Sequence, residues 1–195
     1  FQDLERLASK LVQEIKNVKE NYGIDTFLFL SDTFNNNRDF VDKLCSLIID
    51  KNLNIRWVSN SRVDLIEEKT ANLMKKAGCM LVSLGIESYD EGILRGNKKY
   101  LARKKIDRGI ENFKKNGILT YGYFIFGLAG ETKNSVMKTL FSAFRSKLDF
   151  ARFYSLTPFP GTEYFSRFNH LKWKSYFHGI SDIAEYDNLS KNEIK

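Results

Sequence analysis

One stretch decides the fold: Ile118-Leu-Thr-Tyr-Gly-Tyr-Phe-Ile-Phe-Gly-Leu-Ala-Gly-Glu131. Its apolar and aromatic run is too short to span a membrane, and it stops abruptly at a glycine-rich segment. The pattern predicts a buried strand that enters a tight turn before a helix. Gly127 and Gly130 would let a ligand approach bare backbone, and the carboxylate of Glu131 suits the start of a helix. A tight turn without a ligand explains the same glycines, so the other strand ends must decide.

Four further apolar runs are typical of buried strands, and helical patterns separate them. The predicted strands cover residues 26–31, 53–58, 79–86, 118–126 and 150–155, and the predicted helices include residues 4–18, 40–48, 73–77, 106–113 and 136–144. Apolar strands that alternate with helices predict an α/β protein with a parallel sheet. Because the first element is a helix, we also expect a strand upstream of Phe1.

Polar residues follow every predicted strand, and ligands bind beyond the carboxyl ends of strands in such folds. They are Ser31 and Asp32, then Ser59, Asn60, Arg62 and Asp64, then Glu87 and Ser88, then residues 127–131, and finally residues 157–162. Polar ends on all strands favour an open half-barrel with sequential strand order over a doubly wound sheet with one switch point. Taken one at a time, these residues are better explained by turn caps, an Arg62–Asp64 ion pair or a proline-stiffened loop than by a ligand.

Glu87 is the polar residue that a structural role explains least well. An acid that closes the buried run from Met80 to Ile86 is costly unless it meets a cation or hydrogen-bond donors. We expect its carboxylate to face a ligand cleft. The competing interpretation is a buried ion pair with Arg62 or Arg95.

The composition indicates one sizeable core, because 43% of the 195 residues are hydrophobic and only 28% are charged. A net charge of +7 suggests anionic partners, but the paired lysines lie on helical segments with acids nearby. A nucleic-acid role would need a concentrated basic stripe with stacking aromatics, so it is the less favoured interpretation. Neither a transmembrane run nor a signal peptide is present in the sequence, which predicts a cytoplasmic protein.

The cysteines and histidines have no spacing typical of a metal site or a catalytic triad. Cys45 lies in a helical pattern and Cys79 begins an apolar run, so both are expected to be buried, reduced thiols that bind no iron. His170 and His178 are the two histidines. The chain itself therefore offers no convincing metal site.

An ordered set of motifs over residues 10–165 resembles the radical S-adenosylmethionine (radical SAM) superfamily. The motifs are Trp57 with Ser61-Arg-Val-Asp64, Ala77-Gly-Cys79, Gly85-Ile-Glu-Ser88, Gly127-Leu-Ala-Gly-Glu-Thr132 and Pro158-Phe-Pro-Gly-Thr162. Each motif is weak, but their order and intervals are specific. Within the superfamily the set is most similar to the branch that often carries an N-terminal cobalamin-binding domain.

The resemblance implies a partial (β/α) barrel that holds a [4Fe-4S] cluster and cleaves S-adenosylmethionine reductively to a 5′-deoxyadenosyl radical. The cluster motif of the family, C-x-x-x-C-x-x-C, is absent from this sequence. In the family it lies directly upstream of the helix with which this chain begins. We therefore expect residues 1–165 to be a core fragment, inactive alone, and residues 166–195 to be a C-terminal extension.

The resemblance also assigns residues to S-adenosylmethionine. Asp32 would bind the methionyl amino group, Glu87 and Ser88 the ribose, Ile125 and Gly127 the adenine, and Arg95 or Lys98 the methionyl carboxylate. Three departures affect these details. Ser31 replaces a second acid, Ala129 replaces a proline of the turn, and a threonine common after Asn97-Lys98 is missing.

The expected partners are a small-molecule substrate and an electron donor protein. Methyl transfer, cyclisation or rearrangement of that substrate fits the resemblance, with cobalamin held by another domain. The alternatives are a tRNA-modifying enzyme similar to the methylthiotransferases, which the positive charge allows, and a barrel-derived binding module without catalysis.

Overall fold

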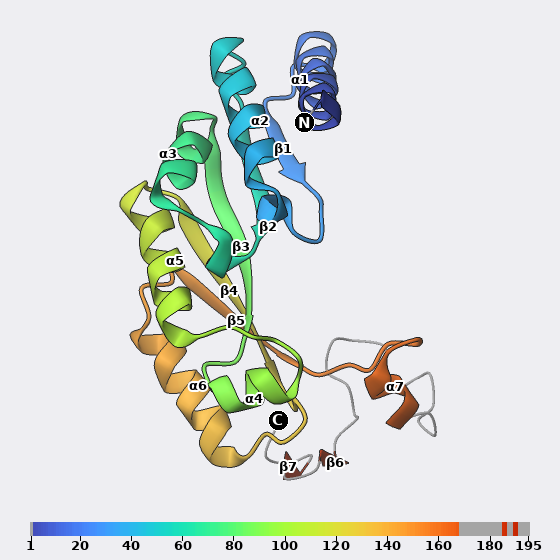
Figure 1. Ribbon diagram of the computed structural model, residues 1–195, viewed down its shortest axis with the longest axis vertical. Coiled ribbons are helices and arrows are strands. Elements are labelled where there is room, and N and C mark those ends of the chain that lie inside the picture. The colour runs from blue at the N-terminus through green and yellow to red at the C-terminus, as the bar shows by residue number, and fades with distance from the viewer. Residues whose placement is uncertain (1, 168–184, 187–188, 191–195) are drawn as a thin grey trace. The chain divides into compact units, whose positions relative to one another are not determined.

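The computed structural model describes residues 2–167, 185–186 and 189–190 (Figure 1). The chain divides into two compact units. The first consists of Phe1–Gly85, Lys104–Gly122 and Lys147–Phe150, and the second of Ile86–Arg103, Tyr123–Ser146 and Ala151–Lys195. Each unit is therefore assembled from segments that are distant in the sequence.

Five strands form one sheet in the order of the sequence. They are β1 (Thr26–Phe29), β2 (Arg56–Ser61), β3 (Cys79–Glu87), β4 (Leu119–Phe126) and β5 (Phe150–Ser155). Strand β2 pairs in parallel with β1 on one side and β3 on the other. The expected α/β class and sequential strand order are confirmed, since β2 and β5 are not neighbours.

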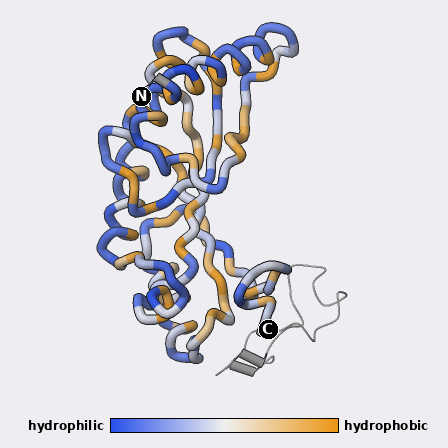
Figure 2. The backbone as a smooth tube through the Cα atoms, turned by 45° about the vertical axis from the view of Figure 1, so that its right-hand side comes forward, coloured by the Kyte–Doolittle hydropathy of each residue, from blue (hydrophilic) through white to orange (hydrophobic). Residues whose placement is uncertain are grey.

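Helices lie between the strands. They are α1 (Gln2–Tyr22), α2 (Arg38–Asp50), α3 (Glu68–Lys76), α4 (Glu91–Gly96), α5 (Arg103–Lys115), α6 (Lys133–Arg145) and α7 (Glu163–Arg167), with short 3-10 turns η1 (Phe34–Asn36) and η2 (Val63–Leu65). Two further short strands, β6 (Glu185–Tyr186) and β7 (Leu189–Ser190), pair in an antiparallel manner. Figure 2 shows the alternating hydrophilic and hydrophobic residues of the amphipathic helices.

Two sequence predictions need correction. The second strand begins at Arg56 instead of residue 53, because Asn54 has a φ of 44° and interrupts extended backbone. Ser59 and Ser61 therefore lie within the strand, where both are buried. Helices α4 and α7 were not predicted, since each is too short for apolar periodicity to reveal it.

The core of the first unit surrounds Trp57, which is fully buried on β2. Its ring centroid lies 4.8 Å from that of Phe29 and 5.1 Å from that of Phe34, and its indole N–H donates to the carbonyl of Ala77 at 2.9 Å. The second unit packs Phe124 of β4 between Tyr89 and Phe153, at centroid distances of 5.7 and 5.0 Å. Among the described residues no helix is long and apolar enough to cross a bilayer.

Candidate functional site

Glu87 ends β3 with an unusual backbone conformation. Its φ is 68°, in the left-handed region that a residue with a side chain occupies at a cost of about 1–2 kcal/mol. The carboxylate is half-buried and accepts a hydrogen bond from Nζ of Lys99 at 2.9 Å. The competing interpretation named Arg62 or Arg95 as the partner, whereas the cation that pairs with Glu87 is Lys99, which follows α4. A strained residue with a half-buried carboxylate is typical of a binding site.

Ser88 is fully buried directly after Glu87. Its hydroxyl lies 3.0 Å from the hydroxyl of Thr139 on α6 and accepts a hydrogen bond from the N–H of Asp90 at 3.1 Å. The N–H of Tyr89 donates to the same Thr139 hydroxyl at 3.1 Å. These bonds fix the backbone that follows Glu87. The predicted contact between Ser88 and a ribose remains a prediction.

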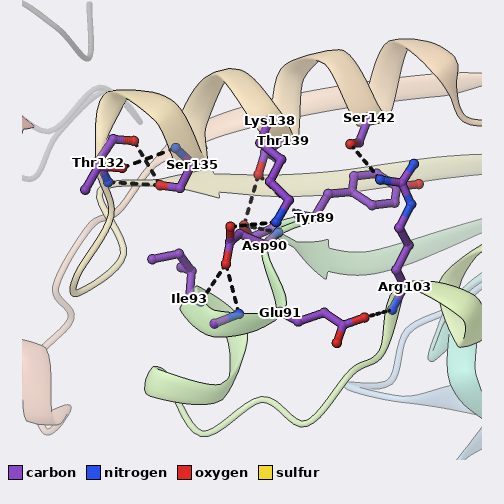
Figure 3. A network of polar contacts seen from close by, with 12 residues as sticks. Tyr89, Asp90, Glu91, Ile93, Arg103, Thr132, Ser135, Lys138, Thr139 and Ser142 are labelled. Carbon is purple, nitrogen blue, oxygen red and sulfur yellow. Dashed lines mark hydrogen bonds and ion pairs between the residues drawn. The ribbon is translucent and has the colours of Figure 1, made fainter.

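Asp90 caps the N-terminus of α4, which explains why so short a helix forms. Its carboxylate accepts hydrogen bonds from the N–H groups of Gly92 at 2.9 Å and Ile93 at 3.2 Å. It also forms an ion pair with Lys138 of α6 at 2.9 Å, as Figure 3 shows. The hydrogen bond from Lys138 is the main cause that lowers the pKa of Asp90, so the cap is charged at neutral pH.

Arg103, the first residue of α5, connects the end of the segment that follows β3 to α6. Its guanidinium lies over the ring of Tyr89, 5.4 Å from the centroid, and donates to the hydroxyl of Ser142 at 3.2 Å. The backbone N–H of Arg103 donates to the carboxylate of Glu91 at 2.8 Å. The whole segment from β3 to α5 is therefore held at both ends (Figure 3).

Glu131 organises the turn after β4. Its side chain is almost fully buried, and Oε2 accepts hydrogen bonds from the N–H groups of Gly127 at 2.6 Å and Leu128 at 3.2 Å. Burial raises the pKa of this carboxyl to about 7, and the two backbone hydrogen bonds oppose that rise. Its other oxygen, Oε1, is buried without a hydrogen-bond partner among the described residues. Sequence reasoning used this acid only as a helix-start signal and missed its role in the turn.

Two side chains that lie outside the turn, those of Tyr164 and Asn97, also form hydrogen bonds with its backbone. The hydroxyl of Tyr164 in α7 accepts a hydrogen bond from the N–H of Ala129 at 2.8 Å and donates to the side-chain oxygen of Asn97. The amide group of Asn97 donates to the carbonyl of Ala129 at 3.1 Å. Sequence reasoning gave no signal for Tyr164, because 35 residues separate it from the turn.

The residues predicted to bind the methionyl carboxylate of the cofactor are Arg95 and Lys98, and both belong to the second unit, as this turn does. Arg95 is exposed in the last turn of α4, and Lys98 follows with a φ of 60°. The Nζ of Lys98 forms an exposed ion pair with Glu163 at 2.6 Å. Lys98 also lines a small cavity of about 70 Å³, which has room for little more than water.

Asp32 is the one predicted cofactor residue in the first unit, where it is exposed after β1. The predicted residues Glu87, Ser88, Arg95, Lys98, Ile125 and Gly127 all belong to the second unit. The alternative ion pair in the first unit is confirmed, because Arg62 donates to both oxygens of Asp64 at 3.1 and 3.0 Å.

The cysteines of this chain do not fit an iron–sulfur cluster. A [4Fe-4S] cluster needs accessible thiolates from neighbouring cysteines. Cys45 and Cys79 are free and buried, as expected, and burial raises the pKa of both thiols, that of Cys45 to about 12. The described residues contain no group of three or more His, Cys, Asp or Glu that could hold a metal ion.

Comparison with known proteins identifies the same family that the sequence motifs indicated. The family model of the Radical SAM superfamily matches residues 3–143. The chain is 34% identical over 193 residues to a protein of Pyrococcus horikoshii described as an uncharacterized methyltransferase, covering 96% of the chain and 42% of that relative. It is 33% identical over 130 residues to the bacteriochlorophyllide d C-12(1)-methyltransferase of Chlorobaculum tepidum, covering 64% and 28%. The chain thus spans less than half the length of these relatives.

A solved structure has the same fold. It is the radical S-adenosylmethionine methyltransferase TsrM of Kitasatospora setae with cobalamin and a [4Fe-4S] cluster bound. The TM-score is 0.74 at 22% identity, over 80% of this chain and 32% of that one. The family model and the long sequence match together identify the family, and this chain belongs to the radical SAM superfamily.

Proposed function

We propose that this chain is the core of a cobalamin-dependent radical SAM methyltransferase that acts on a small molecule. The observation that carries the reaction class is the 34% identity, over 96% of the chain, to a protein described as a methyltransferase. Residues 1–165 would form the S-adenosylmethionine-binding core, and residues 166–195 an extension. Cobalamin would be held by another domain of the longer protein.

The [4Fe-4S] cluster would supply the electron for cleavage of S-adenosylmethionine, after reduction by an electron donor protein. Since Cys45 and Cys79 do not fit it, cysteines of the longer protein would be its ligands. The chain described here would then contribute only binding and orientation of S-adenosylmethionine.

Glu87 is the central residue of this proposal. A carboxylate accepts hydrogen bonds from two ribose hydroxyls well, and the half-buried position of Glu87 strengthens such bonds relative to water. Lys99 donates a hydrogen bond to this carboxylate and so restricts its rotamer. Ser88 would act on the ribose mainly by fixing the backbone of Glu87, since its own hydroxyl is buried.

Other residues would contact the adenine and the methionyl group of S-adenosylmethionine. Adenine would lie against Ile125 and the bare backbone of Gly127, whose φ is 90°. Arg95 or Lys98 would pair with the methionyl carboxylate, and the exposed carboxylate of Asp32 with the amino group.

The test compares Glu87→Gln with the parent in the full-length protein, reconstituted anaerobically with iron, sulfide and cobalamin. Consumption of S-adenosylmethionine is followed as 5′-deoxyadenosine plus S-adenosylhomocysteine. Loss of a charged hydrogen-bond acceptor predicts about a tenfold rise in the KM for S-adenosylmethionine. Glu68→Gln, which changes an exposed acid on α3, is the matched control. Parent-like kinetics of Glu87→Gln would reject the ribose assignment, and failure of the parent to consume S-adenosylmethionine would reject the proposed function.

A further inference from the structure

The two faces of β4 and β5 carry different aromatic clusters in the second unit. On one face Phe153 stacks with Phe124 and Phe126, at centroid distances of 5.0 and 5.2 Å, and Phe124 is fully buried. On the other face Tyr123 lies 5.8 Å from Tyr154 at an interplanar angle of 50°. Because side chains alternate along a strand, the tyrosines point away from the phenylalanine core.

An arginine completes the tyrosine face. Arg152 lies two residues before Tyr154 on β5, and its guanidinium carbon is 4.8 Å from the centroid of the Tyr154 ring. Among the described residues no carboxylate pairs with Arg152, and its guanidinium contacts the Tyr154 ring instead. Arg152 is exposed, whereas the two tyrosines are half-buried. We call Tyr123, Arg152 and Tyr154 the Tyr–Arg platform.

The chemistry of the platform selects a particular kind of ligand. Tyrosine rings and a stacked guanidinium offer flat surfaces to a conjugated ring system. The guanidinium also has five N–H donors in one plane, which match the two oxygens of a carboxylate. The stacking on Tyr154 orients these donors before a ligand arrives, which lowers the entropy cost of binding.

The platform lies next to the predicted adenine contact. Ile125 follows Tyr123 by two positions on β4, so the two side chains share one face of the strand, about 7 Å apart. A ligand stacked on Tyr123 would therefore lie beside a cofactor that contacts Ile125. Substrate and cofactor must be neighbours for group transfer.

We propose that the Tyr–Arg platform binds the substrate, and that the substrate is a flat conjugated ring compound carrying a carboxylate. This inference rests on the proposed function, because it places the substrate at the same site as S-adenosylmethionine. The ring system packs against Tyr123 and Tyr154, whose rings are inclined to each other by 50°, and Arg152 pairs with the carboxylate. An Arg–Tyr contact that serves only to pack the strand would not discriminate between ligands with and without a carboxylate.

The test uses three probes on the full-length, reconstituted protein. Pyrenebutyrate has both a flat ring system and a carboxylate, pyrenebutanol has only the ring system, and cyclohexanebutyrate has only the carboxylate. Pyrene fluorescence reports binding of the first two, and competition with pyrenebutyrate reports the third. Pyrenebutyrate is expected to bind about tenfold more tightly than either of the others.

Two variants separate the contributions. Arg152→Gln is expected to weaken pyrenebutyrate about tenfold and to change pyrenebutanol by less than about twofold. Tyr154→Leu is expected to weaken both pyrene probes by about tenfold, because it removes the stacking surface. Arg145→Gln on α6 and Tyr100→Leu, both at exposed positions of the second unit, are the matched controls and should bind like the parent.

Equal effects of Arg152→Gln on both pyrene probes would overturn the assignment of the carboxylate, and parent-like binding by Tyr154→Leu would overturn the platform itself. Binding of the probes is measured without turnover. A protein that binds pyrenebutyrate through Arg152 but consumes no S-adenosylmethionine would reject the proposed function alone, whereas consumption without discrimination between the probes would reject the platform alone.

Discussion

The Nζ of Lys99 lies 2.9 Å from a carboxylate oxygen of Glu87, and this pair joins the end of β3 to the segment that follows α4. Both side chains are half-buried, with 31% and 24% of their surfaces exposed. Water therefore partly screens the attraction between the two charges, so this ion pair forms without a fully buried environment.

Replacement of Glu87 by Gln should change the free energy of unfolding by less than about 1 kcal/mol, because a partly exposed ion pair contributes little to stability. Chemical denaturation of the full-length protein, followed by circular dichroism, measures this. Lys99→Met should give a similarly small change. A loss of about 3 kcal/mol or more would indicate a fully buried pair instead, and would contradict the picture of an accessible carboxylate.

Glu131 should make stability depend on pH in an unusual direction. Its pKa of about 7 in the folded protein lies above the ordinary value of 4.5, so the folded state binds more protons between these values. The stability from this group is complete below pH 4.5 and is lost as the pH rises through about 7, by up to about 3 kcal/mol. Glu131→Gln should remove that part of the slope, as measured by denaturation at several pH values. Glu68→Gln should leave the slope unchanged, and an identical slope in both variants would contradict the assignment.

Gly109 should tolerate no side chain. A Cβ built on this residue of α5 would lie 1.9 Å from the carbonyl oxygen of Val63, which belongs to η2. We expect Gly109→Ala to destabilise the protein by about 2–3 kcal/mol, because backbone has to move. Gly96→Ala at the end of α4 is the matched control, since nothing lies within 4 Å of its Cβ. It should be neutral or stabilising by up to about 1 kcal/mol, as measured by thermal unfolding. Equal effects of the two substitutions would show that α5 does not pack closely on Val63.

The two cysteines should be dispensable for the iron–sulfur cluster. Full-length protein carrying Cys45→Ala and Cys79→Ala is expected to keep its iron content and its visible charge-transfer absorption after anaerobic reconstitution. The physical reason is that burial disfavours the thiolate form of both side chains. Iron content that falls in the double variant, with circular dichroism unchanged, would make at least one of them a ligand.

The sequence predicted the strands well and the polar contacts poorly. Strands β3 and β4 are mostly apolar runs that begin shortly after Gly78 and Gly117, so local pattern and tertiary burial agree there. Strand β2 was misplaced because its polar Ser59 and Ser61 are buried inside the sheet, which no apolar pattern reveals. The position of Asn54 in the left-handed region is likewise a tertiary result.

Glu87 was recognised as unusual from its sequence context, but its partner Lys99 was not. The cation lies 12 residues away, and only the turn fixed by Ser88 and the short helix α4 bring it back to the strand. Contacts of this kind depend on how a loop folds, and residue spacing in an irregular segment does not determine that.

Three consecutive N–H groups of the turn after β4 already donate hydrogen bonds within the protein. The N–H groups of Gly127 and Leu128 donate to Glu131, and the N–H of Ala129 donates to Tyr164. A purine placed against this turn could not be distinguished from another purine by these three amides, since they have no proton left to offer its ring nitrogens. Any preference for one base over another must come from shape, apolar contact or backbone carbonyls at the turn, or from groups elsewhere. An S-adenosylmethionine analogue that is altered only in the ring nitrogens of its base should therefore lose little affinity at these three amides.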